Sequence, residues 1–252
     1  MQFNEVLVFD IESEYGHFRK FNTTTSPLTY SIPTRPALAG LLGAILGIER
    51  ELAAGKFKAG ATPLSDLFSK ETTGIAVQLL HPVNKVNIAF NLLDTEKSGA
   101  SFFNIKQRTQ VEFELLKNPS FRIFVGTDNG LFNELCQRVK SGSTHFTPYL
   151  GLSQFTATIR YRGVQAVSDL KAGESTEVIT AVNLNEADRD DPVQFNYGSD
   201  FKYTSDTMPV EMKSDRQVVE YAEVIIETNG NSVYIKSDRI RRVEGFGNIL
   251  FL

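Results

Sequence analysis

Three basic residues lie in a segment that contains no acidic side chain. Residues 15–48 include no Asp or Glu, whereas Arg19, Lys20 and Arg35 stand there among threonine, serine and tyrosine residues. Guanidinium and ammonium groups neutralise phosphates, and hydroxyls donate hydrogen bonds to them. This composition is suited to an anionic backbone. The alternative is a solvated loop whose aromatic rings are buried.

Few residues could hold a metal. Asp10, Glu12 and Glu14 alternate, so on a strand they would share one face and could hold a divalent cation. Carboxylates at a strand end beside a basic loop are more often solvated or paired with Arg or Lys. The single cysteine, Cys136, excludes an internal disulfide and a zinc site of several cysteines, and the three histidines are far apart in sequence. We expect no metal and no cofactor.

Length and composition are those of an ordinary globular protein. The 252 residues are 41% hydrophobic and suffice for one sizeable core or two small domains. The longest stretch without charged or strongly polar residues, 36–48, is far shorter than the ~20 residues of a membrane-spanning helix. The N-terminus has the pattern of a strand and not of a secretory leader. We expect a cytoplasmic protein without a membrane partner.

The acidic residues are unevenly placed. The net charge is −4, and residues 169–215 alone carry eleven Asp or Glu against four Lys or Arg, so the remainder of the chain carries +3. The overall charge therefore argues only weakly against a nucleic-acid partner. We expect the acidic stretch to be a solvated loop, although it could contact a basic protein.

The basic segment is expected to lie between a strand and a helix. Residues 3–11 predict a buried strand, residues 15–35 a long polar loop, and residues 36–53 a helix that begins with a proline and ends before Gly55. Three glycines lower the propensity of this helix, and we explain them by close backbone packing on a sheet: Gly40, Gly43 and Gly47.

The other elements of the first 165 residues are strands and one helix. Strands are predicted at 74–80 and 86–93 as an inserted hairpin, at 108–116 and 121–125 as the clearest hairpin of the chain, and at 155–161, with a helix at 131–140. In chain order this is a ferredoxin-like (RRM-like) βαββαβ pattern in an α+β fold, with an elaboration between the middle strands.

The pattern weakens after residue 165. A strand is consistent with residues 176–182, residues 185–214 are charged and irregular, and 218–227 with 233–236 predict a hairpin through an Asn-Gly turn. The apolar C-terminus, 248–252, is expected to dock on the sheet or on a partner. We therefore expect a core domain over 1–165 and a β-rich C-terminal elaboration over 166–252.

Several N-terminal motifs occur in a characteristic order. They are GHFRK at 16–20, SPLTY at 26–30, PTR at 33–35 and GLLGAILG at 40–47, followed by a strand-turn-strand at 109–125 and the segment 148–155. Together they resemble the CRISPR-associated Cas-five family, whose members are RAMP subunits of type I Cascade complexes. The resemblance covers roughly residues 1–165 and is greatest for the type I-B branch.

The resemblance implies a non-catalytic subunit of an antiviral ribonucleoprotein. It would bind and cap the 5′ tag of the CRISPR guide RNA (crRNA), with a Cas-seven backbone subunit, a Cas-eight-type large subunit and, indirectly, target DNA as partners. Basic groups would neutralise phosphates, threonines would donate hydrogen bonds and aromatic rings would stack on unpaired bases. The residues expected to bind RNA are Phe18, Arg19, Lys20, Thr25, Thr29, Tyr30, Arg35, Lys106, Arg108 and Gln110.

The insertion at about 81–107 resembles the thumb of this family, which presses on the RNA and on the adjacent backbone subunit. The basic and amide-rich residues 106–110 lie at its base. A hairpin that only extends the sheet is an equal alternative, and such polar residues are ordinary on a surface strand edge.

The catalytic alternative is a metal-independent endoribonuclease that processes precursor crRNA, as in the type I-C branch. Such cleavage needs a base near the 2′-OH, an acid for the leaving oxygen and a cation for the phosphorane. His17, Tyr15, Tyr30 and Lys20 could supply these groups. However, His17 belongs to the loop motif shared with members that do not cut. We therefore expect no catalysis.

Overall fold

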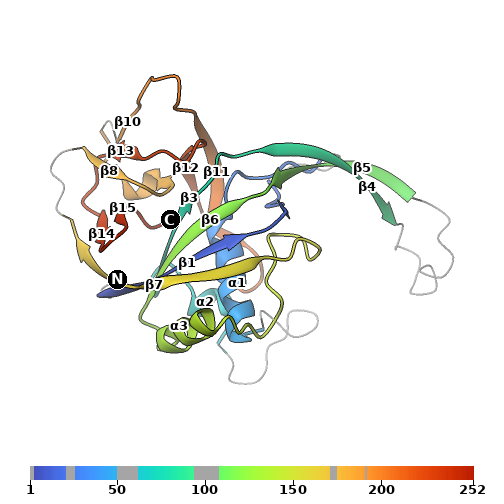
Figure 1. Ribbon diagram of the computed structural model, residues 1–252, viewed down its shortest axis with the longest axis horizontal. Coiled ribbons are helices and arrows are strands. Elements are labelled where there is room, and N and C mark those ends of the chain that lie inside the picture. Colours follow the sequence, from blue (N-terminus) through green and yellow to red (C-terminus); the bar gives the residue numbers. More distant parts are fainter. Residues whose placement is uncertain (1–2, 21–25, 50–61, 94–107, 171–174, 191) are drawn as a thin grey trace.

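The computed structural model describes residues 3–20, 26–49, 62–93, 108–170, 175–190 and 192–252. It is a mixed α and β structure with a curled antiparallel sheet, few helices, a C-terminal group of short sheets, and a two-stranded arm that extends away from the body (Figure 1). Among the helices of the described residues, none has both the length and the apolar character needed to cross a membrane.

A six-stranded sheet forms the centre of the molecule, and every pair of neighbouring strands in it is antiparallel. Its order is β15-β14-β7-β1-β6-β3. The strands are β1 (Glu5–Glu12), β3 (Thr73–Leu79), β6 (Ser120–Thr127), β7 (Thr158–Asp169), β14 (Arg241–Val243) and β15 (Gly247–Ile249). The strand expected at the N-terminus is thus confirmed, and it lies in the middle of the sheet.

Both faces of β1 are covered over most of its length. Leu7, Phe9 and Ile11 pack in the core that includes the helices, whereas Val6 and Val8 pack in a second cluster with C-terminal residues. A strand buried on both faces is a continuous apolar run, and this explains the pattern seen in the sequence. We call the face without the long helices the outer face.

The helix after the basic segment is shorter than expected. Helix α1 (Arg35–Leu46) begins at Thr34, whose hydroxyl accepts a hydrogen bond from the Ala37 N–H, and it ends at Gly47. Gly47 has a left-handed conformation (φ 79°) and its N–H donates to the Gly43 carbonyl over 2.8 Å. The prediction that the helix continues beyond Gly47 is wrong, because this left-handed residue caps it.

The glycines of α1 do not pack on the sheet, so that prediction is also wrong. A Cβ on Gly43 would lie 2.7 Å from Leu64 of the short helix α2 (Leu64–Leu67), and a Cβ on Gly40 would meet nothing within 4 Å. The residues of α1 that share the core with the sheet are large: Leu38, Leu42 and Ile45. Helix α3 (Phe132–Ser141) lies beside α1 and follows its prediction.

Two predicted hairpins are wrong in their pairing. Strand β4 (Lys85–Leu93) pairs with β5 (Arg108–Lys117), and β5 also pairs with β2 (Tyr15–Gly16). The predicted partner of β3 is β4, and the predicted partner of β6 is β5. In the structure β3 and β6 pair with each other. The turn at 117–119, where Asn118 has φ 49°, passes the chain from one sheet to another. The β4–β5 ribbon is the arm of Figure 1, and it includes β5, beyond the expected thumb boundary.

The C-terminal part contains more strand than expected. Its elements are β8 (Thr176–Val178), β9 (Val182–Asn183), a 3-10 turn (Leu184–Glu186), β10 (Val193–Gln194), β11 (Tyr203–Met212), β12 (Val218–Glu227) and β13 (Val233–Ile235). Strand β11 occupies a region predicted to be irregular. The predicted β12–β13 hairpin is wrong, since β12 pairs with β9 and β11 whereas β13 pairs with β8 and β10.

A buried carboxylate explains why the chain changes sheet after β12. Glu227 accepts hydrogen bonds from the backbone N–H groups of Lys202, Asn229 and Asn231, and these bonds fix a loop in place of a tight hairpin turn. The C-terminus docks on the central sheet as expected: the Leu252 N–H donates to the Ile75 carbonyl over 2.9 Å.

Candidate functional site

The two ends of the basic segment lie side by side. Arg19 and Thr29 form an antiparallel bridge, the Lys20 N–H donates to the Leu28 carbonyl, and the Tyr30 N–H donates to the Phe18 carbonyl, each over 2.8 Å. Residues 18–20 and 28–30 therefore form a paired base for this segment. Thr25 falls outside the described residues.

Strand β11 contacts three of the residues expected to bind RNA. Lys20 forms an ion pair with Asp206, and the Tyr30 hydroxyl donates to the Thr207 carbonyl over 2.9 Å. Arg35 lies beside the next part of the strand. This strand comes from the acidic stretch of the sequence, so the C-terminal elaboration provides the partners of the basic segment.

Arg35 is a buried structural residue in this arrangement. Only 2% of its surface is exposed, and its guanidinium donates to the Thr73 carbonyl over 2.7 Å and lies 3.4 Å from both the Val210 carbonyl and Glu211. Burial lowers its pKa to about 10, against the attraction of Glu211, and the side chain stays protonated at neutral pH. Protein acceptors therefore already engage the Arg35 guanidinium, and its expected contact with phosphate stays a prediction.

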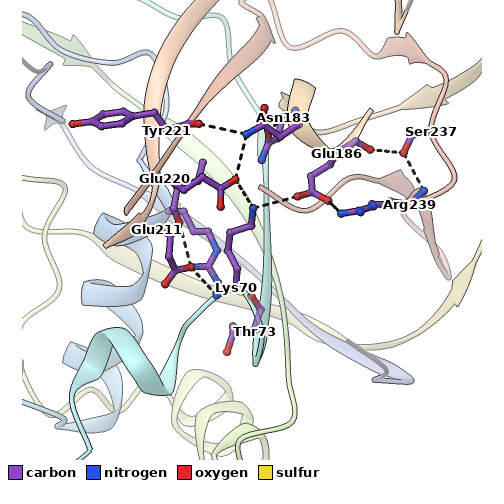
Figure 2. Close-up of polar contacts among 12 residues, drawn as sticks. Lys70, Thr73, Asn183, Glu186, Glu211, Glu220, Tyr221, Ser237 and Arg239 are labelled. Atoms are coloured by element: carbon purple, nitrogen blue, oxygen red, sulfur yellow. Dashed lines mark hydrogen bonds and ion pairs between the residues drawn. The ribbon is translucent and has the colours of Figure 1, made fainter. Parts of the chain in front are cut away.

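A charged network continues from Glu211, a partner of Arg35, to the C-terminal sheets (Figure 2). Glu211 accepts the Lys70 backbone N–H over 2.8 Å, and the Lys70 ammonium, which points between two carboxylates, lies 2.8 Å from Glu220 and 3.2 Å from Glu186. Arg239 pairs with Glu186 at the far end. These contacts join α1, through Arg35, and the segment just before β3, through Lys70, to β11, β12 and the 3-10 turn.

The aromatic rings of the segment are also internal. Phe18 is buried against Phe121 with ring centroids 6.4 Å apart, and Tyr30 is buried beneath the Lys20 ammonium, 5.5 Å from its ring centroid. Neither ring presents a face to an unpaired base here. The alternative of buried rings therefore describes the observed arrangement.

Thr29 uses its hydroxyl within the protein. The oxygen accepts the Phe18 N–H over 2.9 Å and donates to the Tyr30 carbonyl over 3.0 Å, and the residue has no exposed surface. The hydroxyl thus has an internal donor and an internal acceptor in this conformation, and its expected role as a donor to RNA stays a prediction.

Three expected RNA-binding residues lie at the surface. Arg19 is exposed on the loop, and Arg108 and Gln110 are exposed on the arm. Lys106 falls outside the described residues. The exposed members of the residues expected to bind RNA thus lie in two places, Arg19 on the loop and Arg108 with Gln110 along β5.

The arm has one apolar and one polar face. Ile88 opposes Phe113 and Phe90 opposes Val111, and the rings of Phe90 and Phe113 lie 5.0 Å apart. The alternate positions on β4 carry Lys85, Asn87 and Asn91. Lys85 lies at the root of the arm, where its ammonium binds Glu114 and the Thr29 carbonyl and so joins the arm to the loop.

The residues considered for catalysis do not converge on an open site. His17 is buried, with Nδ1 donating to the Glu114 carbonyl over 2.9 Å and Nε2 enclosed without a hydrogen-bond partner among the described residues. Burial lowers the pKa of His17, so the ring is neutral at neutral pH. Tyr15 packs on Phe155 with ring centroids 5.8 Å apart.

The carboxylates at the end of β1 are paired with arginines. Asp10 binds Arg122 and Arg162, and Glu12 binds Arg160. The paired alternative is therefore confirmed, and the described residues include no group of three or more metal-ligating side chains. These arginines are absent from the residues expected to form a site, although Arg160 and Arg162 alternate at the end of a predicted strand and such spacing places two side chains on one face.

Cys136 lies partly buried on α3 and packs against the core, as expected for a structural thiol. Burial raises the pKa of its thiol to about 11, so the sulfur is protonated at neutral pH and is a poor nucleophile.

Comparisons with known proteins agree with this architecture. A family model described as CRISPR-associated protein (Cas_Cas5) matches residues 6–226, whereas no curated protein matches the chain in sequence. A chain titled "CRISPR RNA-guided surveillance complex" is similar in fold, with a TM-score of 0.53, 12% identity and coverage of 90% of this chain and 91% of that chain. A second, "Crystal structure of a CRISPR protein from Archaeoglobus fulgidus", has a TM-score of 0.50, 11% identity and 97% coverage of each chain.

Identities this low show a shared fold and nothing more. The family model, in contrast, spans most of the chain, from the first strand to β12. The protein therefore belongs to the CRISPR-associated Cas-five family.

Proposed function

We propose that the protein is a non-catalytic subunit of a CRISPR effector complex that binds and caps the 5′ tag of crRNA in antiviral defence. The observation that carries this proposal is the family match over residues 6–226. The fold is also similar to that of a chain from an RNA-guided surveillance complex. A cytoplasmic type I-B Cascade is the proposed setting.

The sheet supports a ferredoxin-like RAMP core. Its central strands have the order β7-β1-β6-β3, all antiparallel, with α1 between β1 and β3 and α3 between β6 and β7. This is the order that a βαββαβ unit adopts when both helices cover one face, which here is the face of Leu7, Phe9 and Ile11.

The arm supports the proposed thumb. An isolated two-stranded ribbon is marginally stable in water, and an apolar face such as that of Ile88, Phe90 and Phe113 is stabilised by a neighbouring surface. We assign this face to the Cas-seven backbone subunit, and Arg108 and Gln110 to the RNA. The Cas-eight-type large subunit and, through it, target DNA would bind elsewhere on the complex.

Binding without catalysis is favoured by the state of the four residues that a nuclease could use. His17 is enclosed, Tyr15 packs on Phe155, the Tyr30 hydroxyl donates to a carbonyl, and Lys20 is paired with Asp206. A metal-free cleavage site needs such groups around one phosphate. Because each of these four side chains is enclosed by the protein or already contacts another protein group, the arrangement supports a binding role.

Copurification tests the proposal. The tagged protein is expressed with its complex partners and a CRISPR array, purified, and the bound RNA is sequenced from its 5′ end. We expect one common 5′ tag in the recovered RNA. Recovery of no RNA above a mock purification, or of RNA with scattered 5′ ends, would contradict the proposal.

A cleavage assay tests the endoribonuclease alternative. Labelled repeat RNA is incubated with excess protein under single-turnover conditions, with and without Mg²⁺. We expect no specific product. A specific cut that His17→Ala abolishes would establish the alternative.

A further inference from the structure

Four side chains form a row across the outer face of the central sheet. The strand register places Gln78 of β3 opposite Arg122 of β6, Arg122 opposite Asp10 of β1, and Asp10 opposite Arg160 of β7. The neighbouring outer positions, Val8 and Phe124, are covered by C-terminal residues. The row therefore lies where the apolar cover of this face ends.

A β-bulge adds a third arginine to the row. The β1–β7 register shifts between Val8, which opposes Gly163, and Phe9, which opposes Tyr161, so Arg162 is the extra residue. Gly163 has φ 144°, a conformation that side chains disfavour. Although Arg160 is opposite Asp10, it is Arg162 whose Nε reaches Asp10 Oδ2, over 2.6 Å.

Asp10 holds two guanidinium groups in fixed positions. The residue is only 3% exposed, and its Oδ1 accepts from Arg122 Nε over 2.7 Å while its Oδ2 accepts from Arg122 Nη2 over 3.1 Å and from Arg162 Nε. The Arg122 guanidinium also lies over the Phe246 ring, 5.1 Å from its centroid. Contacts from two sides restrict the Arg122 side chain to one orientation.

The three guanidinium groups keep donors that the described protein residues do not use. Arg122 and Arg160 each use Nε and Nη2 on a carboxylate, which leaves Nη1, and Arg162 uses only Nε, which leaves both Nη groups. The side chains of Arg122, Arg160 and Arg162 are 21%, 57% and 44% exposed. Three cations also exceed the two carboxylates, Asp10 and Glu12, that pair with them.

We propose that Arg122, Arg160 and Arg162 form a phosphate-binding site for a nucleic-acid strand on the outer face of the sheet, with Asp10 as its positioning residue. The inference rests on the proposed function, which makes RNA the source of the phosphates. Planar guanidinium donors match phosphate oxygens, and donors that are already held in place lose little side-chain freedom on binding. The site is separate from the basic loop and from the arm.

A titration with RNA tests the arginines. The full-length protein is titrated into a labelled oligouridylate at several salt concentrations, as wild type and as Arg160→Gln and Arg162→Gln. We expect each substitution to weaken binding by about fivefold and to lower the salt dependence by about 0.7 in log Kd against log salt, as for one lost phosphate contact. The matched control is Arg138→Gln, since Arg138 lies on α3 and pairs with Glu134; it should bind RNA like the wild type.

Asp10→Asn separates positioning from bulk charge. This substitution removes a negative charge, so bulk electrostatics alone would strengthen RNA binding. If Asp10 positions the arginines, binding weakens although the protein becomes more positive. Stronger binding would overturn the positioning role, and a thermal melt of each variant shows that it is folded. If Asp10→Asn does not fold, Arg162→Gln still decides the proposal because 44% of that side chain is exposed and its substitution disturbs little packing.

The results also distinguish this site from the proposed function. If tagged crRNA copurifies and the wild type binds RNA, but Arg160→Gln and Arg162→Gln bind equally well, the phosphate site is wrong and the proposed function stands. Unchanged RNA binding with a loss of protein partners would assign the arginines to an acidic protein surface and would also overturn the site. Failure of the wild type to bind or copurify RNA would overturn both.

Discussion

The ammonium group of Lys20 forms an ion pair with the carboxylate of Asp206, 186 residues further along the chain. Lys20 belongs to the acid-free basic segment, and Asp206 to a strand within the acidic stretch. Because Tyr30 and Arg35 contact the same strand, the basic segment is stabilised by the C-terminal part of the protein. The charge of this segment is therefore partly neutralised before any RNA is bound.

Asp206→Asn should strengthen RNA binding if the basic loop contacts RNA. The substitution removes a negative charge beside Lys20 and keeps the size of the side chain, so a phosphate near Lys20 would meet less repulsion. The measurement is Kd for labelled RNA at low salt. Asp215→Asn, which removes a charge from an exposed turn, is the control. Equal affinity of the two variants would exclude Lys20 from the RNA interface.

Arg35→Ala should destabilise the protein by about 2 kcal/mol or more. It would leave the Thr73 and Val210 carbonyls without their donor and Glu211 without its buried cation. Urea denaturation measures the change in the free energy of unfolding. Arg19→Ala, in the same segment but exposed, should change stability little. Equal effects of the two substitutions would contradict a structural role for Arg35.

His17 should make the protein less stable as the pH falls below its ordinary pKa of 6.5. Burial lowers the pKa of His17 in the folded state, so between that pKa and 6.5 the unfolded chain binds a proton that the folded chain does not. The contribution of neutral His17 to the free energy of unfolding is therefore complete above pH 6.5 and decreases as the pH falls below this value. In His17→Asn the side-chain amide can still donate to the Glu114 carbonyl, and thermal melts from neutral to acid pH should show a weaker pH dependence. A pH dependence identical to that of the wild type would contradict this.

Two glycines of α1, Gly40 within the helix and Gly47 at its C-terminal cap, should respond in opposite directions to substitution by alanine. At Gly40 a Cβ would meet nothing within 4 Å, and Gly40→Ala should stabilise the protein by about 0.5–1 kcal/mol through helix propensity. At Gly47 a Cβ would lie 2.6 Å from the His145 ring in a left-handed conformation, so Gly47→Ala should destabilise it. Thermal unfolding compares the two. Changes of the same sign would contradict the assigned surroundings.

Phe90→Ser should weaken assembly with the neighbouring backbone subunit, because Phe90 lies on the apolar face of the arm. Asn91→Ser changes the adjacent residue on the opposite face and is the matched control. Copurification of the Cas-seven subunit with each variant measures assembly, and thermal melts confirm folding. Equal recovery with both variants would exclude the apolar face as the contact surface.

Local sequence patterns were sufficient for the type and place of most core elements. The apolar run of β1 predicted a buried strand, the helical spacing at 131–140 predicted α3, and the apolar C-terminus predicted docking on the sheet. These properties depend on periodicity and on short-range backbone preferences, which neighbouring residues determine. The resemblance of the N-terminal motifs also identified the family that the comparisons show.

Strand partners and the burial of charges were decided by the tertiary structure. Strands β4, β5, β12 and β13 each have the pattern of a strand, but an alternating strand can pair with any compatible edge, and long-range contacts select which one. Arg35 resembled a solvent-exposed phosphate ligand because β11, which covers it, lies about 170 residues away in sequence. The sequence alone therefore defined most of the core elements and the family, whereas the fold determined which basic residues face solvent, since exposure depends on segments that only folding brings together.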